Sequence, residues 1–259
     1  MHSLLLALLI IGSAVAFSAL GVLAGRRLVR DRVEEFHNEV LISLFASAKV
    51  VYAVLLGFLV IVVWENYDNA RDNVSLEAAS LVPLYRLTYG MQPAHGADMR
   101  QHIRDYIGAV IHDEWRLMRR QAGASLPARR AIGAMDREFA SLNAQTKQTD
   151  ALVDAEFLRD KSTIVSYRNQ RLLEATAGVP WVMWLGAIGG AVITMVMGFM
   201  IYMKSLGPHL IMASLDGALI GLLLFIMVVV SHPFRGPMAL GPQDFSDALH
   251  ILDGVDKGY

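Results

Sequence analysis

The sequence predicts an all-α membrane protein whose four transmembrane helices form two hairpins around a helical extramembrane insert. Composition is the first observation behind this prediction, because 54% of the residues are hydrophobic and only 18% are charged. Soluble domains contain about 45–50% apolar and about 25% charged residues. The second observation is the presence of four apolar segments that are each long enough to cross roughly 30 Å of hydrocarbon.

Residues 4–24, 43–64, 179–203 and 209–230 form these four predicted spans, and none contains more than one charged side chain. The first span could be mistaken for a secretory leader. However, its apolar run is too long for a leader, and its positive cluster follows the apolar residues instead of preceding them. We therefore expect residues 4–24 to cross the membrane.

These spans predict a first transmembrane hairpin over residues 1–64 and a second over residues 179–230. Between them lies an extramembrane domain, residues 65–178, and residues 231–259 form a C-terminal tail. The extramembrane domain carries 15 Lys/Arg and 15 Asp/Glu residues, and such a neutral mixed-charge surface favours a folded domain. Apolar side chains at helical spacing predict helices over residues 99–120 and 151–176. Breaks are expected at 92–96, 123–127 and 178–180, with Pro180 in the first turn of the next helix.

Charged residues between the first two spans give a mixed indication of orientation. By the positive-inside rule, Arg26, Arg27, Arg30 and Arg32 would put the 26–42 linker in the cytoplasm and the extramembrane domain outside. The same linker contains four acidic residues, and the extramembrane domain is too long for the rule to govern it. The acidic residues are Asp31, Glu34, Glu35 and Glu39.

Several functional classes receive no support. The net charge of -1 argues against nucleic-acid binding, and the absence of cysteine excludes disulfides and thiolate metal sites. His102 and His112 do not share the helix face that zinc motifs use, and no phosphate loop, nucleophile elbow or carboxylate pair is visible. We therefore expect no metal, no cofactor and no catalytic residue. Residues 112–115 are interpreted as a helix-surface contact with Trp115 in the core.

The second span continues without a break into a polar helix. At about 100° per residue, an apolar stripe on this helix leads into an acidic one. Copies around a common axis would form an apolar neck that gates by dewetting, followed by a vestibule. Plain helix packing is the alternative interpretation. The predicted neck consists of Val50, Val54 and Phe58, and the predicted vestibule of Lys49, Ile61, Glu65, Asp68 and Asp72.

Two charged residues lie inside the predicted spans. Asp216 is expected to have a partner, because an intramembrane carboxylate costs at least about 2.5–3.5 kcal/mol. It is either an ion-coupling or proton-relay site or a neutral, hydrogen-bonded group near the interface. A ring of Lys49 would concentrate anions, whereas the acidic stripe would favour cations. Lys49 or the acidic residues would have no effect on ion selectivity if they were salt-bridged, so the sign of the permeant ion stays open.

Two short motifs resemble sequences of the bestrophin channels. The first, residues 56–58 followed by 64–69, is similar to the second membrane helix of bestrophins. The second, residues 232–236 followed by Asp244 and Phe245, is similar to the motif after their last span, and its members here include His232, Pro233, Phe234 and Gly236. Over nearly its whole length the chain resembles the bacterial bestrophin-like family, through residues 52–58, 113–115 and 232–236.

The resemblance implies a homo-oligomeric channel, a pentamer, whose second helix lines an anion-conducting, chloride-type pore with a neck at Val50, Val54 and Phe58. It also implies a multi-pass protein of the inner membrane, surrounded by the lipid bilayer, with the helical domain in the cytoplasm. Only Asp244 and Asp247 match the calcium-binding acidic clasp of bestrophins, which gives little support to calcium gating. Two other hypotheses remain: a non-conducting membrane scaffold or sensor whose helical domain binds a partner or ligand, and a transporter that uses Asp216.

Overall fold

The computed structural model describes residues 2–29, 35–145 and 151–258. These residues form helices and short turns, without a strand among them. Of the residues on which the orientation argument depends, Arg30, Asp31, Arg32 and Glu34 lie outside the described residues. The all-α fold with four apolar helices long enough to span a membrane is confirmed.

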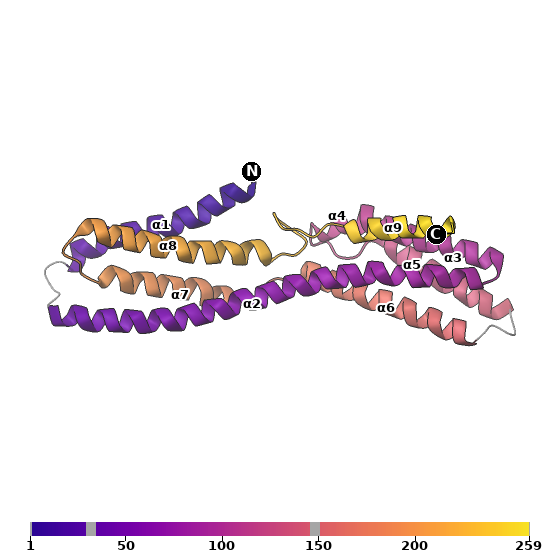
Figure 1. Cartoon of the computed structure of the whole chain (residues 1–259), viewed down its shortest axis with the longest axis horizontal. Coiled ribbons are helices and arrows are strands. Elements are labelled where there is room, and N and C mark those ends of the chain that lie inside the picture. The colour runs from indigo at the N-terminus through magenta and orange to yellow at the C-terminus, as the bar shows by residue number, and fades with distance from the viewer. Residues whose placement is uncertain (1, 30–34, 146–150, 259) are drawn as a thin grey trace. The chain divides into compact units, whose positions relative to one another are not determined.

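The elements follow one another along the chain as helices joined by short turns (Figure 1). Their bounds are α1 (His2–Val29), α2 (Glu35–Leu87), the 3-10 turn η1 (Thr88–Gly90), α3 (Pro93–Ala109), the π-helical turn η2 (Val110–Glu114), α4 (Trp115–Met118), α5 (Leu126–Gln145), α6 (Ala151–Thr176), α7 (Trp181–Met200), α8 (Leu206–Val230) and α9 (Gln243–Asp256).

The chain divides into two compact units. The membrane unit comprises Met1–Glu65 and Val179–His232, and the extramembrane unit comprises Asn66–Gly178 and Pro233–Tyr259. Helix α2 is continuous through the boundary between them, as the uninterrupted apolar-to-polar helix of the sequence predicts.

The helices of the membrane unit differ in length from the predicted spans. Helix α1 extends to Val29 and α2 begins at Glu35, so the predicted 26–42 linker is mostly helix. Helix α7 ends at Met200, because Ile201 has an extended backbone, and Pro180 caps α7 from the position before its first residue. Hydropathy shows which residues suit an apolar environment, whereas the ends of a helix depend on the backbone conformation of single residues.

Small residues set the packing of the membrane unit. A Cβ added to Gly217 of α8 would lie 2.6 Å from Ser18 Oγ and 2.8 Å from the carbonyl oxygen of Ala14 in α1. A Cβ at Gly221 would lie 2.9 Å from the Cα of Ile11. Close approach of this kind drives helix association in membranes, where apolar burial between helices gains little. The two glycines therefore let α8 lie directly against α1.

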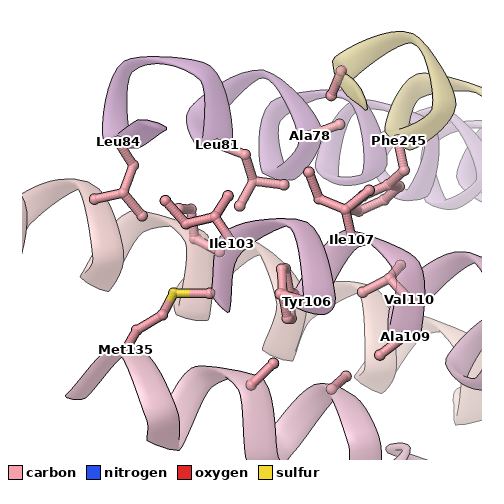
Figure 2. Close-up of a cluster of buried hydrophobic side chains, with 14 of the residues drawn as sticks. Ala78, Leu81, Leu84, Ile103, Tyr106, Ile107, Ala109, Val110, Met135 and Phe245 are labelled. Carbon is pink, nitrogen blue, oxygen red and sulfur yellow. The ribbon is translucent and has the colours of Figure 1, made fainter. Parts of the chain in front are cut away.

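The extramembrane unit has a continuous apolar core (Figure 2). Ile103 and Ile107 of α3 are wholly buried, together with Leu81 of α2 and Phe245 of α9. The predicted helix over 151–176 is confirmed as α6, and that over 99–120 is divided by the η2 turn. Helices α5 and α9 were not predicted from the sequence.

Candidate functional site

The predicted neck lies on the exposed side of α2. Phe58 is 64% exposed and Val50 is 65% exposed, whereas Leu56 is only 2% exposed. At about 100° per residue, the buried side chains of α2 in the membrane unit lie opposite the predicted neck. They are Tyr52, Leu56, Leu59 and Val63. The neck side chains are thus not used for packing within the chain.

The predicted acidic vestibule is also exposed. Glu65, Asp68 and Asp72 have exposed side chains. Across the described residues, none of these carboxylates forms an ion pair with a Lys or Arg of the same chain. Each carboxylate therefore keeps its negative charge available to solvent or to another copy of the chain.

Lys49 and Asp216 form an ion pair between α2 and α8. Their side chains are 31% and 22% exposed, and the Lys49 ammonium also lies over the Phe45 ring, 5.1 Å from its centroid. The partner expected for the intramembrane carboxylate is therefore Lys49. In this conformation the two charges compensate each other, so Lys49 adds no net positive charge beside the neck.

The motif after the last span anchors the chain to the extramembrane core. Phe234 is 1% exposed and packs edge-on against Trp115, with ring centroids 5.8 Å apart. The backbone amide of Leu240 donates to the carbonyl oxygen of Pro233 at 2.7 Å. Gly236 has a φ of +81°, a backbone conformation that glycine adopts without steric cost. The motif forms a tight turn, and its first residue, His232, is exposed.

A buried network of four charged side chains lies in the extramembrane unit, and the sequence analysis did not find it. Arg171 donates to both carboxylate oxygens of Glu77, at 2.7 and 3.0 Å, and to Glu114 at 2.8 Å. Arg168 donates to the other Glu114 oxygen at 2.6 Å. Glu77, Glu114 and Arg171 are fully buried. Buried charges are tolerated when they are paired and hydrogen-bonded in this way.

The interpretation of residues 112–115 as a helix-surface contact is wrong for Glu114. Trp115 is in the core, as predicted, at 2% exposure, but Glu114 is fully buried beside it. The reason is the π-helical turn at Val110–Glu114, whose wider turn shifts the register of the following residues. Glu114 can then reach two arginines of α6 and also accept from the Ser125 amide at 3.0 Å.

Charge pairing changes the acid–base properties of this network. Burial alone would raise the pKa of Glu114, but the guanidinium groups of Arg171 and Arg168 hold that pKa below its ordinary value. Burial and the neighbouring Glu77 carboxylate raise the pKa of Tyr106 well above its ordinary value. Tyr106 stays neutral and donates to Glu77 at 2.5 Å. Glu114 therefore keeps its charge at neutral pH, although it is buried.

One sequence signal could have revealed the network. Glu77 falls on the buried side of α2 together with Val74 and Leu81, and its position is predictable from helical periodicity. Arg168 and Arg171 likewise share the buried side of α6 with Ile164 and Ala175. Charged residues on an apolar helix side predict buried ion pairs. They do not predict which of them pair.

Within the described ranges, three or more His, Cys, Asp or Glu side chains nowhere gather closely enough to hold a metal ion. The calcium clasp suggested by the bestrophin resemblance is reduced to Asp244 and Asp247, and the latter accepts a hydrogen bond from Gln243 at 3.0 Å. These residues carry no argument for a cofactor.

Comparison with known proteins gives a family match over most of the chain. Residues 12–245 match the model of the bestrophin-like domain. No curated protein matches the sequence.

Solved structures agree in fold at low sequence identity. One is a variant of a bacterial bestrophin homologue from Klebsiella pneumoniae, with a TM-score of 0.74 at 13% identity over 96% of this chain and 98% of that chain. Another structure of that homologue has a TM-score of 0.73 at 12% identity over 97% of this chain and 99% of that chain. A variant described only as a membrane protein has a TM-score of 0.73 at 12% identity over 98% of both chains.

Proposed function

The chain belongs to the bestrophin-like family, whose members are ion channels, and we propose that it assembles into a homo-oligomeric ion channel with an apolar neck on α2. It is a multi-pass membrane protein, and its family is one of channels, not of enzymes. We propose that it lies in the inner membrane as a pentamer, the subunit number that the resemblance to bestrophins implies.

One observation carries the neck assignment. Val50, Val54 and Phe58 lie on a side of α2 that the described residues leave more than half exposed, opposite the side that packs against α7. A single helix cannot enclose a passage, but several copies of this side around an axis can. Rings of apolar side chains then form a constriction that closes by dewetting, and no charge is needed to block ions.

The sign of the permeant ion has two candidates. Anion conduction, chloride-type, follows from the resemblance to bestrophins. Cation conduction is favoured by a specific observation: Lys49 is paired with Asp216, whereas Glu65, Asp68 and Asp72 are exposed and have no cationic partner among the residues that the structure describes. An acidic vestibule concentrates cations. The reversal potential under a salt gradient separates the two, because its sign follows the more permeant ion.

Phe58→Ala tests the neck in reconstituted liposomes. Removing a ring of phenyl groups widens the constriction and lowers the barrier to wetting, so we expect ion flux to rise about tenfold, equivalent to roughly 1.4 kcal/mol. Leu55→Ala is the matched control, because Leu55 lies on the same helix, is 41% exposed and lies beside Gly186 of α7. Equal flux in folded wild type and Phe58→Ala protein would contradict the neck.

We propose that the extramembrane unit lies in the cytoplasm, as the bestrophin resemblance implies. The chain has no cysteine, so single-cysteine variants can be labelled without background. A cysteine at the exposed position of Arg119 should resist an impermeant maleimide in intact cells and react after lysis. Labelling in intact cells would reverse the orientation and would favour the outcome suggested by the arginines after the first span.

The non-conducting scaffold or sensor remains the alternative function. In that case α2 would pack against other helices through Val50, Val54 and Phe58, without a passage. Liposomes containing folded, oligomeric protein would then show no ion flux in either the wild type or the Phe58→Ala variant.

A further inference from the structure

A cavity of about 700 Å³ lies inside the membrane unit, bounded by α2, α7 and α8. Its lining is mostly apolar and includes Ile42, Phe45, Met195, Phe199, Met212 and Leu219. This volume falls within the roughly 300–1,000 Å³ of sites that bind small molecules. Nothing in the proposed neck requires a hollow here.

The way α2 is attached keeps this space open. Tyr52 of α2 lies so close to Gly190 of α7 that an added Cβ would be 2.4 Å from its ring, and its hydroxyl donates to the Ala187 carbonyl oxygen at 2.9 Å. Nearer the start of α2, the Lys49–Asp216 ion pair reaches across to α8 on the wall of the cavity. A long lysine side chain bridges the two helices where direct packing does not.

The end of the membrane unit beside the cavity carries more positive than negative charge among its described residues. The Arg26 guanidinium donates to the carbonyl oxygens of Met203 and Lys204, at 3.0 and 2.8 Å. Arg27 and Lys204 are exposed there, as is the Glu39 carboxylate of α2, and α2 begins at this end with Glu35. Arg26 also lines a small hollow that shares Phe199, Tyr202, Met203 and His209 with the large cavity.

We propose that this cavity holds an acyl chain of an anionic phospholipid, whose phosphate lies at the Arg27–Lys204 rim. Water is a poor filler for an apolar hollow between membrane helices, whereas an acyl chain supplies the missing contacts. Basic sites between transmembrane helices are the ones that bind anionic headgroups. The inference goes beyond ion conduction, because it assigns a lipid site away from the neck.

The first test counts bound lipid. Protein reconstituted in equal amounts of palmitoyl-oleoyl phosphatidylglycerol and phosphatidylcholine is extracted into detergent, washed and analysed by native mass spectrometry. We expect phosphatidylglycerol to be retained, about one molecule per chain, and phosphatidylcholine to be lost. Equal retention of the two lipids, or retention of neither, would overturn the proposal.

The second test fills the cavity. Ala213 lines it, so Ala213→Phe should displace the acyl chain and abolish retention. Ala16→Phe is the matched control, because Ala16 is exposed on α1 and does not line the cavity. Unchanged retention in Ala213→Phe would contradict the site, as would a neighbouring copy of the chain occupying the cavity in the oligomer.

The third test is independent of any change in packing. Arg27→Gln combined with Lys204→Gln should lower affinity for phosphatidylglycerol by roughly fivefold for each cation removed. Arg119→Gln combined with Lys257→Gln removes two exposed cations of the extramembrane unit instead and should leave binding unchanged. An equal loss of phosphatidylglycerol affinity in both double variants would show a general charge effect and would contradict the assignment of the phosphate to the rim.

Discussion

The two units of this chain solve the burial of charge in different ways. Among its described residues, the membrane unit has one ion pair between its helices, Lys49 with Asp216, on a cavity wall, and α1 and α8 approach each other at glycines. The extramembrane unit fully encloses Glu77, Glu114 and Arg171, with Arg168 nearly enclosed, inside an apolar core. The stability of the membrane unit should therefore depend on glycines, which let its helices approach closely. The stability of the extramembrane unit should depend on the pairing of its buried charges.

The largest expected effect follows from breaking the buried network. Arg171→Met leaves the fully buried Glu77 and Glu114 carboxylates short of a partner, which should lower the free energy of unfolding by about 3–5 kcal/mol. Chemical denaturation in detergent measures this loss. Arg159→Met is the control, because Arg159 is 76% exposed and its pair with Glu156 should contribute less than about 1 kcal/mol. A similar loss of unfolding free energy in both variants would mean that the buried network stabilises the unit no more than an exposed ion pair does.

A smaller effect should follow from adding a side chain to the membrane unit. Gly217→Leu forces α8 away from the Ala14 carbonyl and Ser18 of α1, at a cost of about 1–3 kcal/mol. Gly12→Leu is the matched control, because a Cβ at Gly12 meets nothing within 4 Å. The change in thermal denaturation midpoint distinguishes them. If Gly217→Leu is as stable as Gly12→Leu, the close approach of α1 and α8 is wrong.

The network also predicts a pH dependence that belongs to the extramembrane unit. Because the pKa of Glu114 is lowered on folding, its contribution is present above the unfolded pKa and is lost as the pH falls through the folded pKa. Stability should therefore drop at acidic pH, and Glu114→Gln should flatten this part of the profile. Asp113→Asn, at a partly exposed neighbour that pairs with Arg116, should leave the profile unchanged. A profile unaffected by Glu114→Gln would contradict the assignment.

The smallest effect on stability is expected on α2. Glu65→Gln, Asp68→Asn and Asp72→Asn together remove exposed charges that have no cationic partner in the described part of the chain, so the free energy of unfolding should change by less than about 0.5 kcal/mol for each position. The reversal potential is the informative readout. If the carboxylates select cations, the triple variant loses cation preference. If the channel conducts anions despite them, anion preference increases.

Hydropathy predicted the spans because a continuous run of about 20 apolar residues is typical of a transmembrane helix and unusual in a soluble domain. Periodicity predicted α6, and it placed the proposed neck and vestibule residues on one stripe of α2. The helix α5 was missed although Ala128, Met135 and Phe139 lie at helical spacing, because small and polarisable residues give a weak apolar stripe. The π turn before Trp115 has no sequence signature, so the burial of Glu114 could not be predicted. The Lys49–Asp216 pair joins residues 167 positions apart, and local pattern cannot specify such contacts.

The most direct test of the central claim is a symmetry-resolved electron microscopy map of the protein in lipid nanodiscs. The account predicts a ring of subunits, five by the bestrophin resemblance, with α2 nearest the axis and Phe58 at the narrowest point of the passage. A lone subunit, or a ring in which Phe58 contacts lipid, would contradict it.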